Sequence, residues 1–472
     1  MPGITSYGVY LPRGRLLRQD IGAVLGGGGG PGSRAVAGYD EDTTSMAVEA
    51  GRVALRAAGG VRSDIDGLIF STVAPAYLDK SNASAIHAAL RLKSEAAALD
   101  AHGSARSLFG ALRLGLNAPG RMLVVASEIR AGLAGSADES QGGDGAVAFV
   151  TGDSGCIAEL VSAASETDEL LDRWRLPGEL ISRVWEERFA EQILVPMARR
   201  VADRALAAAG VSLDAVDRIV VGGTHRRAVR RFKSELAKAG GQLQADASEE
   251  IGDAGAVGAG VGVAAALDAA KSERWILVVV ISDGADALLF RTTEGVEGVR
   301  PSPTVEEQIR GEGQAVPYAR YLSWRGLLER EPPRRPDPAR PAAPPSHRAR
   351  RWKFGFVGSE CRGCGSRYLP PQRTCLHCGA VDRMDEAPFA DRRGRVATYT
   401  VDWLAYSPSP PVIAAVIDFE GGGRFSCELT DVDPDELCIG AQVQMTFRRL
   451  YTAGGVHNYF WKARPARKGD AT

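Results

Sequence analysis

Four of the seven cysteines lie in a pattern typical of a metal site. They form two C-x2-C pairs separated by ten residues, Cys361/Cys364 and Cys375/Cys378. A glycine follows each pair and lets backbone N–H groups approach the thiolate sulfur. Four thiolates complete the tetrahedral shell of Zn²⁺ and leave no open position for catalysis. The pattern therefore predicts a closed structural zinc site in a zinc ribbon at residues 352–384, with His377 as a bystander.

The residues after this ribbon alternate between short apolar runs and glycine-rich turns. Five runs are present, at residues 394–404, 411–422, 423–432, 440–451 and 457–465. Five short strands with such turns are typical of a small OB-like β-barrel. We therefore expect an OB-fold domain at residues 385–472.

The N-terminal part of the chain contains an internal repeat. Residues 54–72 are similar to residues 205–224 at an offset of 151 positions (205 − 54 = 151). Residues 121–127 are similar to residues 275–282 at an offset of 154 (275 − 121 = 154). The longer copies read as an alanine-rich helix, a turn and an apolar strand. Any α/β protein repeats a helix and a strand, but the nearly constant offset favours two duplicated halves.

Composition limits the class of protein. The 472 residues are 44% hydrophobic and 24% charged, which predicts two or three domains with real cores. A net charge of -1 argues against nucleic acid or a membrane surface as partner. No apolar run reaches the roughly 20 residues of a membrane span, and no signal peptide pattern is present. We expect a cytoplasmic protein that binds small molecules or other proteins.

Several motifs occur in a recognisable order along the duplicated region. They are EDTTSMAVEAGRVAL at 41–55, LDKSNAS at 78–84, GGDGAVAFVTGD at 142–153 and IGDAGAVGAGVG at 251–262. Together with the repeat, they resemble the thiolase superfamily, and within it the hydroxymethylglutaryl-CoA synthases and ketoacyl synthase III enzymes. The resemblance covers residues 1–295 and implies a duplicated, five-layer αβαβα fold. It also implies a homodimer and an acyl-CoA or acyl-carrier thioester as substrate.

The resemblance leaves the nucleophile position of this family vacant. The cysteine that carries the acyl group falls at Ala105, in the stretch GSARSLFGAL. Ser104 and Ser107 are near it, but consecutive residues of a helix point about 100° apart, so neither replaces the thiol. The glutamate that acts as an acid in the synthases has no counterpart before Asp79. Turnover through a covalent acyl-enzyme is therefore not expected.

Other groups of the family keep a counterpart. The histidine at the end of the second-half strand falls at His225, where it would polarise a thioester carbonyl or move a proton. The asparagine of the ketoacyl synthases falls at Asp253, which we expect to orient His225. His102 is a third candidate catalytic residue beside the vacant position.

Two connecting segments carry expectations of their own. Residues 168–210 read as helical and resemble an insertion that caps the substrate tunnel of this fold. Their apolar side chains are more typical of core than of tunnel lining, namely Trp185, Phe189, Ile193 and Leu194. In residues 296–351, the sequence predicts an aromatic helix that docks onto a neighbouring domain. A Pro- and Arg-rich linker follows this helix.

The C-terminal part resembles a second family. A zinc ribbon followed by an OB barrel, at residues 352–465, is similar to OB-fold domains found beside or fused to thiolases and hydroxymethylglutaryl-CoA synthases. In that family the module is thought to bind or relay acyl-CoA. Two functions remain open. One is an enzyme that forms or cleaves C–C bonds of an acyl thioester without an acyl-enzyme, and the other is a non-catalytic scaffold for acyl-CoA or a second thiolase-type protein.

Overall fold

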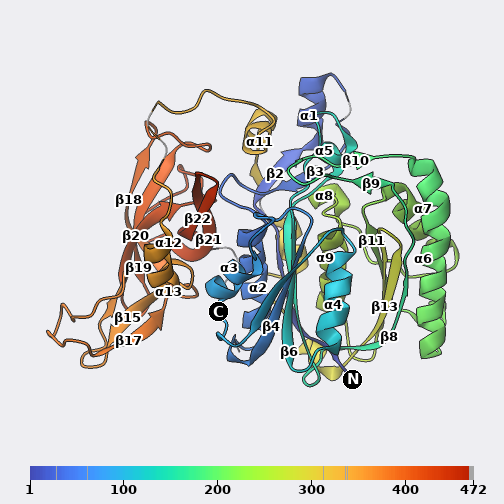
Figure 1. Cartoon of the computed structure of the whole chain (residues 1–472), viewed down its shortest axis with the longest axis horizontal. Coiled ribbons are helices and arrows are strands. Elements are labelled where there is room, and N and C mark those ends of the chain that lie inside the picture. Colours follow the sequence, from blue (N-terminus) through green and yellow to red (C-terminus); the bar gives the residue numbers. More distant parts are fainter. Residues whose placement is uncertain (28, 61, 312, 335, 337, 467–472) are drawn as a thin grey trace.

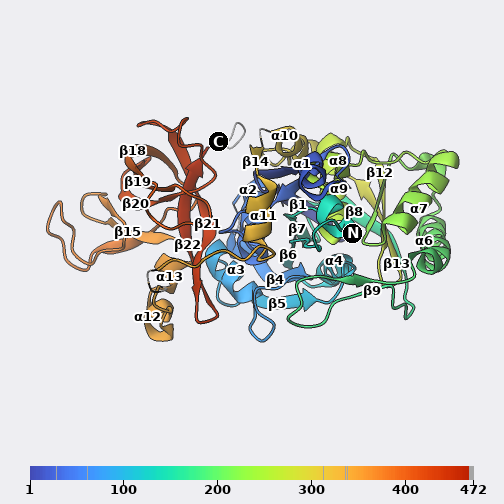
Figure 2. The same cartoon turned by 90° about the horizontal axis from the view of Figure 1, so that it is seen from above.

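The computed structural model describes residues 1–27, 29–60, 62–311, 313–334, 336 and 338–466. A large α/β part, blue to yellow in Figure 1, packs against a β-rich C-terminal part drawn in orange and red. Figure 2 shows the same two parts side by side from above. Within the described ranges, no helix is both long and apolar enough to cross a membrane.

A nine-stranded sheet is the frame of the α/β part, in the order β11-β12-β13-β8-β1-β7-β6-β4-β5. The first half of the chain supplies β1 (Gly3–Tyr10), β4 (Ile65–Thr72), β5 (Ala97–His102), β6 (Arg121–Glu128) and β7 (Gly145–Gly152). The second half supplies β8 (Ala158–Glu166), β11 (Arg218–Gly223), β12 (Trp275–Ile281) and β13 (Ala285–Thr292). The halves join where β1 pairs with β8 through Gly3 and Ile4 alone.

The two halves repeat the same strand pairing, which confirms the predicted duplication. In the first half β1–β7 and β7–β6 are antiparallel, and β6–β4 and β4–β5 are parallel. In the second half β8–β13 and β13–β12 are antiparallel and β12–β11 is parallel. Leu243 forms an isolated parallel bridge to Ile219, in the place that β5 occupies in the first half. The matched sequence segments contain β4 and β11, and β6 and β12.

Each half of the sheet forms one β layer, and the helices form three layers, one between the halves and one on each outer side. The predicted five-layer fold is therefore confirmed (Figure 1). The outer layers are α2 (Thr43–Ala57) with α3 (Ala83–Leu90), and α6 (Glu187–Ala209) with α7 (Arg226–Lys238). Between the halves lie α4 (Ser107–Asn117) and α9 (Ala256–Ala269). Helix α9 consists of small apolar residues because it touches strands of both halves. A Cβ on Gly260 would lie 2.6 Å from Val147, so only glycine permits this approach.

Shorter elements complete the α/β part. They are β2 (Gly14–Leu17), α1 (Arg18–Leu25), β3 (Ser33–Val36), η1 (Arg62–Asp64), α5 (Ala137–Gln141), η2 (Leu213–Ala215), α8 (Ser248–Ile251) and η3 (Glu294–Glu297). Strand β2 pairs with β3, and with β14 (Gln314–Ala315) from the later segment. Strands β2 and β3 lie with α1 and α5 at the upper end of the molecule in Figure 1.

The helical prediction for residues 168–210 is wrong over its first part. Helix α6 begins at Glu187, and the residues before it form a flap with the short pair β9 (Arg173–Trp174) and β10 (Arg183–Val184). Polar side chains of the flap bind other segments, since Arg173 pairs with Asp138. Core burial is also wrong for two of the four apolar side chains, because Trp185 and Phe189 are about half exposed. Leu194 is buried as expected.

The segment at residues 296–351 packs closely onto the α/β part in its first portion. Its elements are α10 (Val305–Arg310), β14, α11 (Tyr318–Trp324), α12 (Ala343–Arg348) and α13 (Arg350–Lys353). Helix α11 is the predicted aromatic helix, and Tyr321 within it is fully buried. The indole N–H of Trp324 donates to the carbonyl oxygen of Pro408 in the barrel, at 3.1 Å. Helix α11 therefore contacts both parts of the chain.

The C-terminal part has the predicted OB-like barrel and a ribbon before it. The ribbon holds β15 (Val357–Cys361), β16 (Arg367–Tyr368) and β17 (Met384–Pro388). The barrel strands are β18 (Arg393–Asp402), β19 (Val412–Phe419), β20 (Arg424–Leu429), β21 (Gln442–Ala453) and β22 (Val456–Pro465). They close in the order β18-β19-β20-β22-β21.

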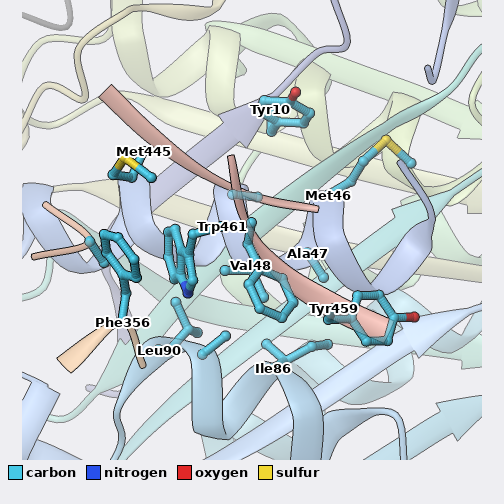
Figure 3. Close-up of a cluster of buried hydrophobic side chains, with 14 of the residues drawn as sticks. Tyr10, Met46, Ala47, Val48, Ile86, Leu90, Phe356, Met445, Tyr459 and Trp461 are labelled. Atoms are coloured by element: carbon cyan, nitrogen blue, oxygen red, sulfur yellow. The ribbon is translucent and has the colours of Figure 1, made fainter. Parts of the chain in front are cut away.

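One hydrophobic core continues from the barrel into the α/β part. Figure 3 shows side chains of α2 and α3 facing those of the barrel, among them Met46, Val48, Ile86, Leu90, Met445, Tyr459 and Trp461. Buried charges pair across the same contact. Arg448 of β21 pairs with Glu41, and the ammonium of Lys462 lies 3.0 Å from Asp40. The barrel is thus fixed on the outer helices of the first half.

Candidate active site

The two buried helices begin next to each other, and Ala105, the predicted counterpart of the family's cysteine, lies where they meet. Ala105 lies just before α4 and is 4% exposed, while Gly255 precedes α9 with a positive φ of 60°. A Cβ on Gly255 would lie 3.8 Å from the Cβ of Ala105 and 3.5 Å from Thr224. The carboxyl ends of the parallel strands β4, β5, β6 and β11 meet at the same edge. Ligands of α/β sheets commonly bind at such an edge.

The two serines near Ala105 are held in the turn before α4. The hydroxyl of Ser107 donates to the carbonyl oxygen of His102 at 3.3 Å and accepts from the backbone N–H of Ser104. The hydroxyl of Ser104 accepts from the N–H of Arg106 at 3.2 Å. Both hydroxyl groups are therefore hydrogen-bonded to the local backbone, and neither is paired with a base that would activate it as a nucleophile.

His225 caps the amino end of α7 directly after β11. Its Nδ1 accepts a hydrogen bond of 3.0 Å from the backbone N–H of Ala228. The side chain is buried, and Nε2 has no hydrogen-bond partner among the described residues. An occupied Nδ1 lone pair places the ring proton on Nε2 in the neutral imidazole. His225 thus presents an unpaired N–H donor, and a donor of this kind binds a carbonyl or enolate oxygen.

Among the described residues, neither a hydrogen bond nor an ion pair joins Asp253 to His225. Its Oδ1 accepts from the backbone N–H of Gly255 at 2.8 Å, and its Oδ2 lies 3.6 Å from Nε of Arg226. The acid that interacts with His225 is Asp172 of the flap. Burial raises the pKa of Asp172, and the interaction with His225 acts in the opposite direction. Asp172 and His225 also line the same cavity, whereas Asp253 is not among its lining residues.

His102 lies apart from the other two candidates. It ends β5, and its Nε2 is 4.0 Å from Oδ1 of Asp100. That carboxylate already accepts from the backbone N–H groups of Asn82 and Ala83, at 2.7 and 2.8 Å. Within the described part of the chain, no hydrogen bond joins His102 to His225 or Asp253.

A cavity of about 280 Å³ opens beside His225. The flap forms one wall through Ile181 and Val184, and Thr224 lies next to the histidine in the lining. The opposite wall carries Asp138, which accepts from Arg173 at 2.5 Å and from Arg226 at 3.2 Å. Burial acts to raise the pKa of Asp138, but the hydrogen bond and charge of Arg173 hold it below its usual value.

Sequence reasoning missed Glu128, the last residue of β6. Its carboxylate accepts from the backbone N–H of Val73, with distances of 3.3 and 3.4 Å to its two oxygens. The side chain is buried, and burial raises the pKa of Glu128 to about 7. An acid with such a pKa exchanges protons near neutral pH. An acidic residue closing the apolar run RMLVVASE was the signal that the sequence offered.

The four ribbon cysteines come together as predicted. Their sulfur atoms all lie within 4.8 Å of one another, with separations of 3.6 Å for Cys361–Cys378 and 3.5 Å for Cys364–Cys375. Backbone N–H groups also reach the sulfurs, from Gly363 to Cys361 at 3.3 Å and from Cys378 to Cys375 at 3.4 Å. The four sulfurs fit the tetrahedral shell of a metal ion such as Zn²⁺.

Curated proteins match the two parts of the chain separately. The hydroxymethylglutaryl-CoA synthase of Methanothermobacter thermautotrophicus is 29% identical over 354 residues, which cover 70% of this chain and 99% of the relative. The DUF35 domain-containing scaffold protein of the same organism is 30% identical over 118 residues, 24% of this chain and 88% of the relative. The family described as "ChsH2, C-terminal OB-fold domain" matches residues 388–448.

Solved structures agree with the fold of the larger part. A hydroxymethylglutaryl-CoA synthase complexed with CoA has a TM-score of 0.60 at 16% identity, covering 68% of this chain and 89% of that one. The 3-oxoacyl-[acyl-carrier-protein] synthase III of Aquifex aeolicus has a TM-score of 0.53 at 21% identity, covering 62% and 100%. The larger part of the chain is thus similar to hydroxymethylglutaryl-CoA synthases and has the thiolase-type fold, and its C-terminal part belongs to the DUF35 domain-containing scaffold proteins.

Proposed function

We propose that this protein forms or cleaves a C–C bond of an acyl-CoA or acyl-carrier thioester without forming an acyl-enzyme. Similarity to hydroxymethylglutaryl-CoA synthase along 99% of the relative's length supports the class of reaction. Ala105 supports the absence of a covalent step, because a methyl group cannot attack a thioester and both nearby serine hydroxyls are engaged. The reaction is then of the aldol or retro-aldol type.

The observation that carries this proposal is the buried, unpaired Nε2 of His225 beside the cavity. In the cleavage direction, Nε2–H donates to the thioester oxygen and stabilises the enolate that forms there. A carboxylate removes the β-hydroxyl proton, the Cα–Cβ bond breaks, the β-carbon becomes a carbonyl, and the enolate carbon takes a proton. We assign both proton transfers to Glu128, because it ends β6 at the sheet edge where the candidate site lies and burial raises its pKa to about 7.

We further propose a metal ion, a substrate class and an oligomeric state for this protein. The zinc ion is structural, held by the four ribbon cysteines, and the CoA thioester is a substrate. The protein is a homodimer by analogy with its superfamily. Support for this state comes from β5, which ends the nine-stranded sheet with Leu99 46% exposed. Such an edge can pair with the same strand of a second copy.

The competing candidate is a scaffold that binds acyl-CoA or a second thiolase-type protein without catalysis. The similarity of the C-terminal part to DUF35 domain-containing scaffold proteins favours it. In that case His225 and Glu128 would affect binding at most. The barrel would hold the acyl-CoA or the partner enzyme.

The full chain should be incubated alone with 3-hydroxyacyl-CoA thioesters, with product carbonyls followed by mass spectrometry. Turnover that disappears in His225→Ala, without an adduct in the intact mass, is the expected result. As a positive control for adduct detection, Ala105→Cys should acquire the mass of the acyl group. Turnover with a covalent adduct on the unchanged chain would refute the non-covalent mechanism. Turnover that requires a second protein would favour the scaffold.

A further inference from the structure

Arg130 is a buried cation beside the vacant nucleophile position. It follows β6 by two residues and is 8% exposed. Its backbone is fixed at both ends, since its N–H donates to Asp144 at 2.9 Å and its carbonyl oxygen accepts from Arg34 at 2.7 Å. Asp144 and Arg34 are themselves fully buried and paired at 3.1 Å. The start of the Arg130 side chain is therefore held in one place by the core.

The guanidinium of Arg130 has no partner within the described part of the chain. No carboxylate lies within the 4.0 Å of an ion pair, and no hydrogen bond leaves its nitrogen atoms. Burial lowers the pKa of Arg130, and Asp138 and Asp253 are among the charges that oppose this effect. Its nitrogens are not among the buried polar atoms that lack a partner, so the guanidinium stays open to solvent and its five donors are free for the acceptors of a ligand.

The two aspartates near Arg130 are already engaged by other arginines. Asp138 binds Arg173 and Arg226, and Asp253 faces the Nε of Arg226. Three arginines thus share two carboxylates, which leaves one positive charge in excess. Glu128 offsets this charge only in part, because its pKa of about 7 leaves much of it neutral at physiological pH. A ligand group with a single negative charge would neutralise the excess positive charge of these arginines.

The unpaired guanidinium also lies where the reacting end of a thioester would arrive. Its Nη1 would be 3.8 Å from a Cβ on Gly255, and the same Cβ would be 3.8 Å from that of Ala105. Thr224, which contacts this point at 3.5 Å, lines the cavity next to His225. Alanine and glycine at these two positions leave the space in front of Arg130 without side chains.

We propose that Arg130 binds a carboxylate on the acyl part of the thioester, so that the substrates are acyl-CoAs with a second, free carboxyl group. This assignment rests on the proposed function only in taking an acyl thioester as the ligand. The planar guanidinium offers two parallel N–H donors, which match a carboxylate and do not match an alkyl end. An acyl chain without a carboxylate offers the guanidinium of Arg130 no acceptor.

Binding to the full chain tests this assignment without any need for turnover. Calorimetric titrations should compare succinyl-CoA with butyryl-CoA, and glutaryl-CoA with pentanoyl-CoA, which differ in the terminal carboxylate. We expect the carboxylate member of a pair to bind about 10- to 100-fold more tightly, as for a hydrogen bond to a charged group. In Arg130→Met the two members should bind equally. Arg130→Lys should keep part of the preference, and Arg230→Gln, an exposed change on α7, should keep all of it.

The outcomes separate this assignment from the proposed reaction. Equal affinity of the unchanged chain for both members overturns it even if Arg130→Met fails to fold. A carboxylate preference that survives in a folded Arg130→Met, as judged by circular dichroism, also overturns it. If Arg130→Met weakens the alkyl and carboxylate members alike, the guanidinium binds the thioester oxygen instead, and the assignment is wrong. A preference lost in Arg130→Met without turnover of any thioester supports the carboxylate site and refutes the reaction alone.

Discussion

The backbone N–H of Ala228 donates to Nδ1 of His225 at 3.0 Å, and this single bond decides what the histidine can do. It makes His225 the cap of α7 and leaves the proton on Nε2, where no described residue accepts it. Of the two roles that the sequence suggested, polarising a carbonyl and moving a proton, this geometry favours the first, with the side chain as a hydrogen-bond donor. Structural and chemical roles meet in one side chain, so substitutions must be chosen to separate them.

His225→Ala removes both roles, whereas His225→Asn keeps a cap and an amide donor. We expect His225→Ala to lower kcat/KM by about 100- to 1,000-fold, the loss typical of one oxyanion donor. It should also lower the free energy of unfolding by about 1 kcal/mol, because the cap is lost. His225→Asn should retain most of the stability and part of the activity. Steady-state kinetics and urea unfolding check both values.

The control for this pair is His347→Ala, an exposed histidine on α12. It should change neither kcat/KM nor stability. Equal activity of His225→Ala and the unchanged chain would show that Nε2 does not contact the reacting group.

Glu128 should make the free energy of unfolding fall as the pH rises from 4.5 to about 7. A carboxylate whose pKa is lowered by an ion pair has the opposite effect. Burial raises the pKa of Glu128 in the folded state from 4.5 to about 7, so the folded state binds this proton more tightly than the unfolded state. The contribution of this proton to the free energy of unfolding is largest below pH 4.5, declines between pH 4.5 and 7, and is lost above that range. Glu128→Gln keeps an uncharged side chain and lacks the decline. Relative to the unchanged chain, it should gain about 3 kcal/mol between pH 4.5 and 8.

Urea unfolding at a series of pH values measures this difference. Glu297→Gln, an exposed change, is the matched control and should follow the unchanged chain at every pH. A constant difference between Glu128→Gln and the unchanged chain would place the pKa of Glu128 near its ordinary value. Activity of the unchanged chain should also change around pH 7 if this carboxylate carries the proton.

Zinc removal should unfold the ribbon first. The ribbon strands β16 and β17 are short, and the four cysteines hold the two C-x2-C turns together. We expect one zinc ion per chain by atomic emission, and its loss in Cys375→Ser or with a strong chelator. Both treatments should lower the Tm and increase proteolysis near residues 361–378, because metal binding contributes directly to folding. Cys438→Ser, at an exposed cysteine of the barrel, should bind zinc as before. Full zinc content in Cys375→Ser would refute the four-cysteine site.

Strong local patterns made much of the fold predictable. The near-constant offset between β4 and β11, and between β6 and β12, reflects two copies of one strand order. The barrel strands were also predictable, because alternating apolar residues and glycine turns set their limits. The flap before α6 was not, since its apolar residues, among them Trp185, have helical spacing in a segment that an ion pair and a short hairpin keep extended. Tertiary contacts outweighed the local pattern there.

The sequence predicts which elements carry the candidate site residues, but not the partners of these residues. Ala105 and His225 lie where the motif order placed them, at the starts of α4 and α7. Asp253 was expected to orient His225, but backbone geometry at Gly255 takes its carboxylate instead. Glu128 and Arg130 were missed because their importance comes from burial and the lack of partners. Neither property is visible in a single sequence.

The contact between the barrel and the α/β part should depend on one buried arginine. Arg448 is fully buried and pairs with Glu41 from the α/β part and with Asp431 at 2.7 Å. Arg448→Met leaves these carboxylates buried without their cation, so the free energy of unfolding should fall by about 3–5 kcal/mol. The double change Arg448→Met/Glu41→Gln should recover part of the loss, because one uncompensated charge is removed.

An exposed ion pair in the same barrel gives the scale for this loss. Arg424 and Asp418 pair at 2.5 Å with side chains 66% and 47% exposed, so Arg424→Met should cost less than about 1 kcal/mol. Because one core runs from α2 into β21 and β22, urea should unfold the unchanged chain in a single transition as seen by both circular dichroism and tryptophan fluorescence. In Arg448→Met the two signals should separate, since the barrel is released first. Coincident transitions in Arg448→Met, or a loss no larger than that of Arg424→Met, would mean that apolar packing alone holds the two parts together.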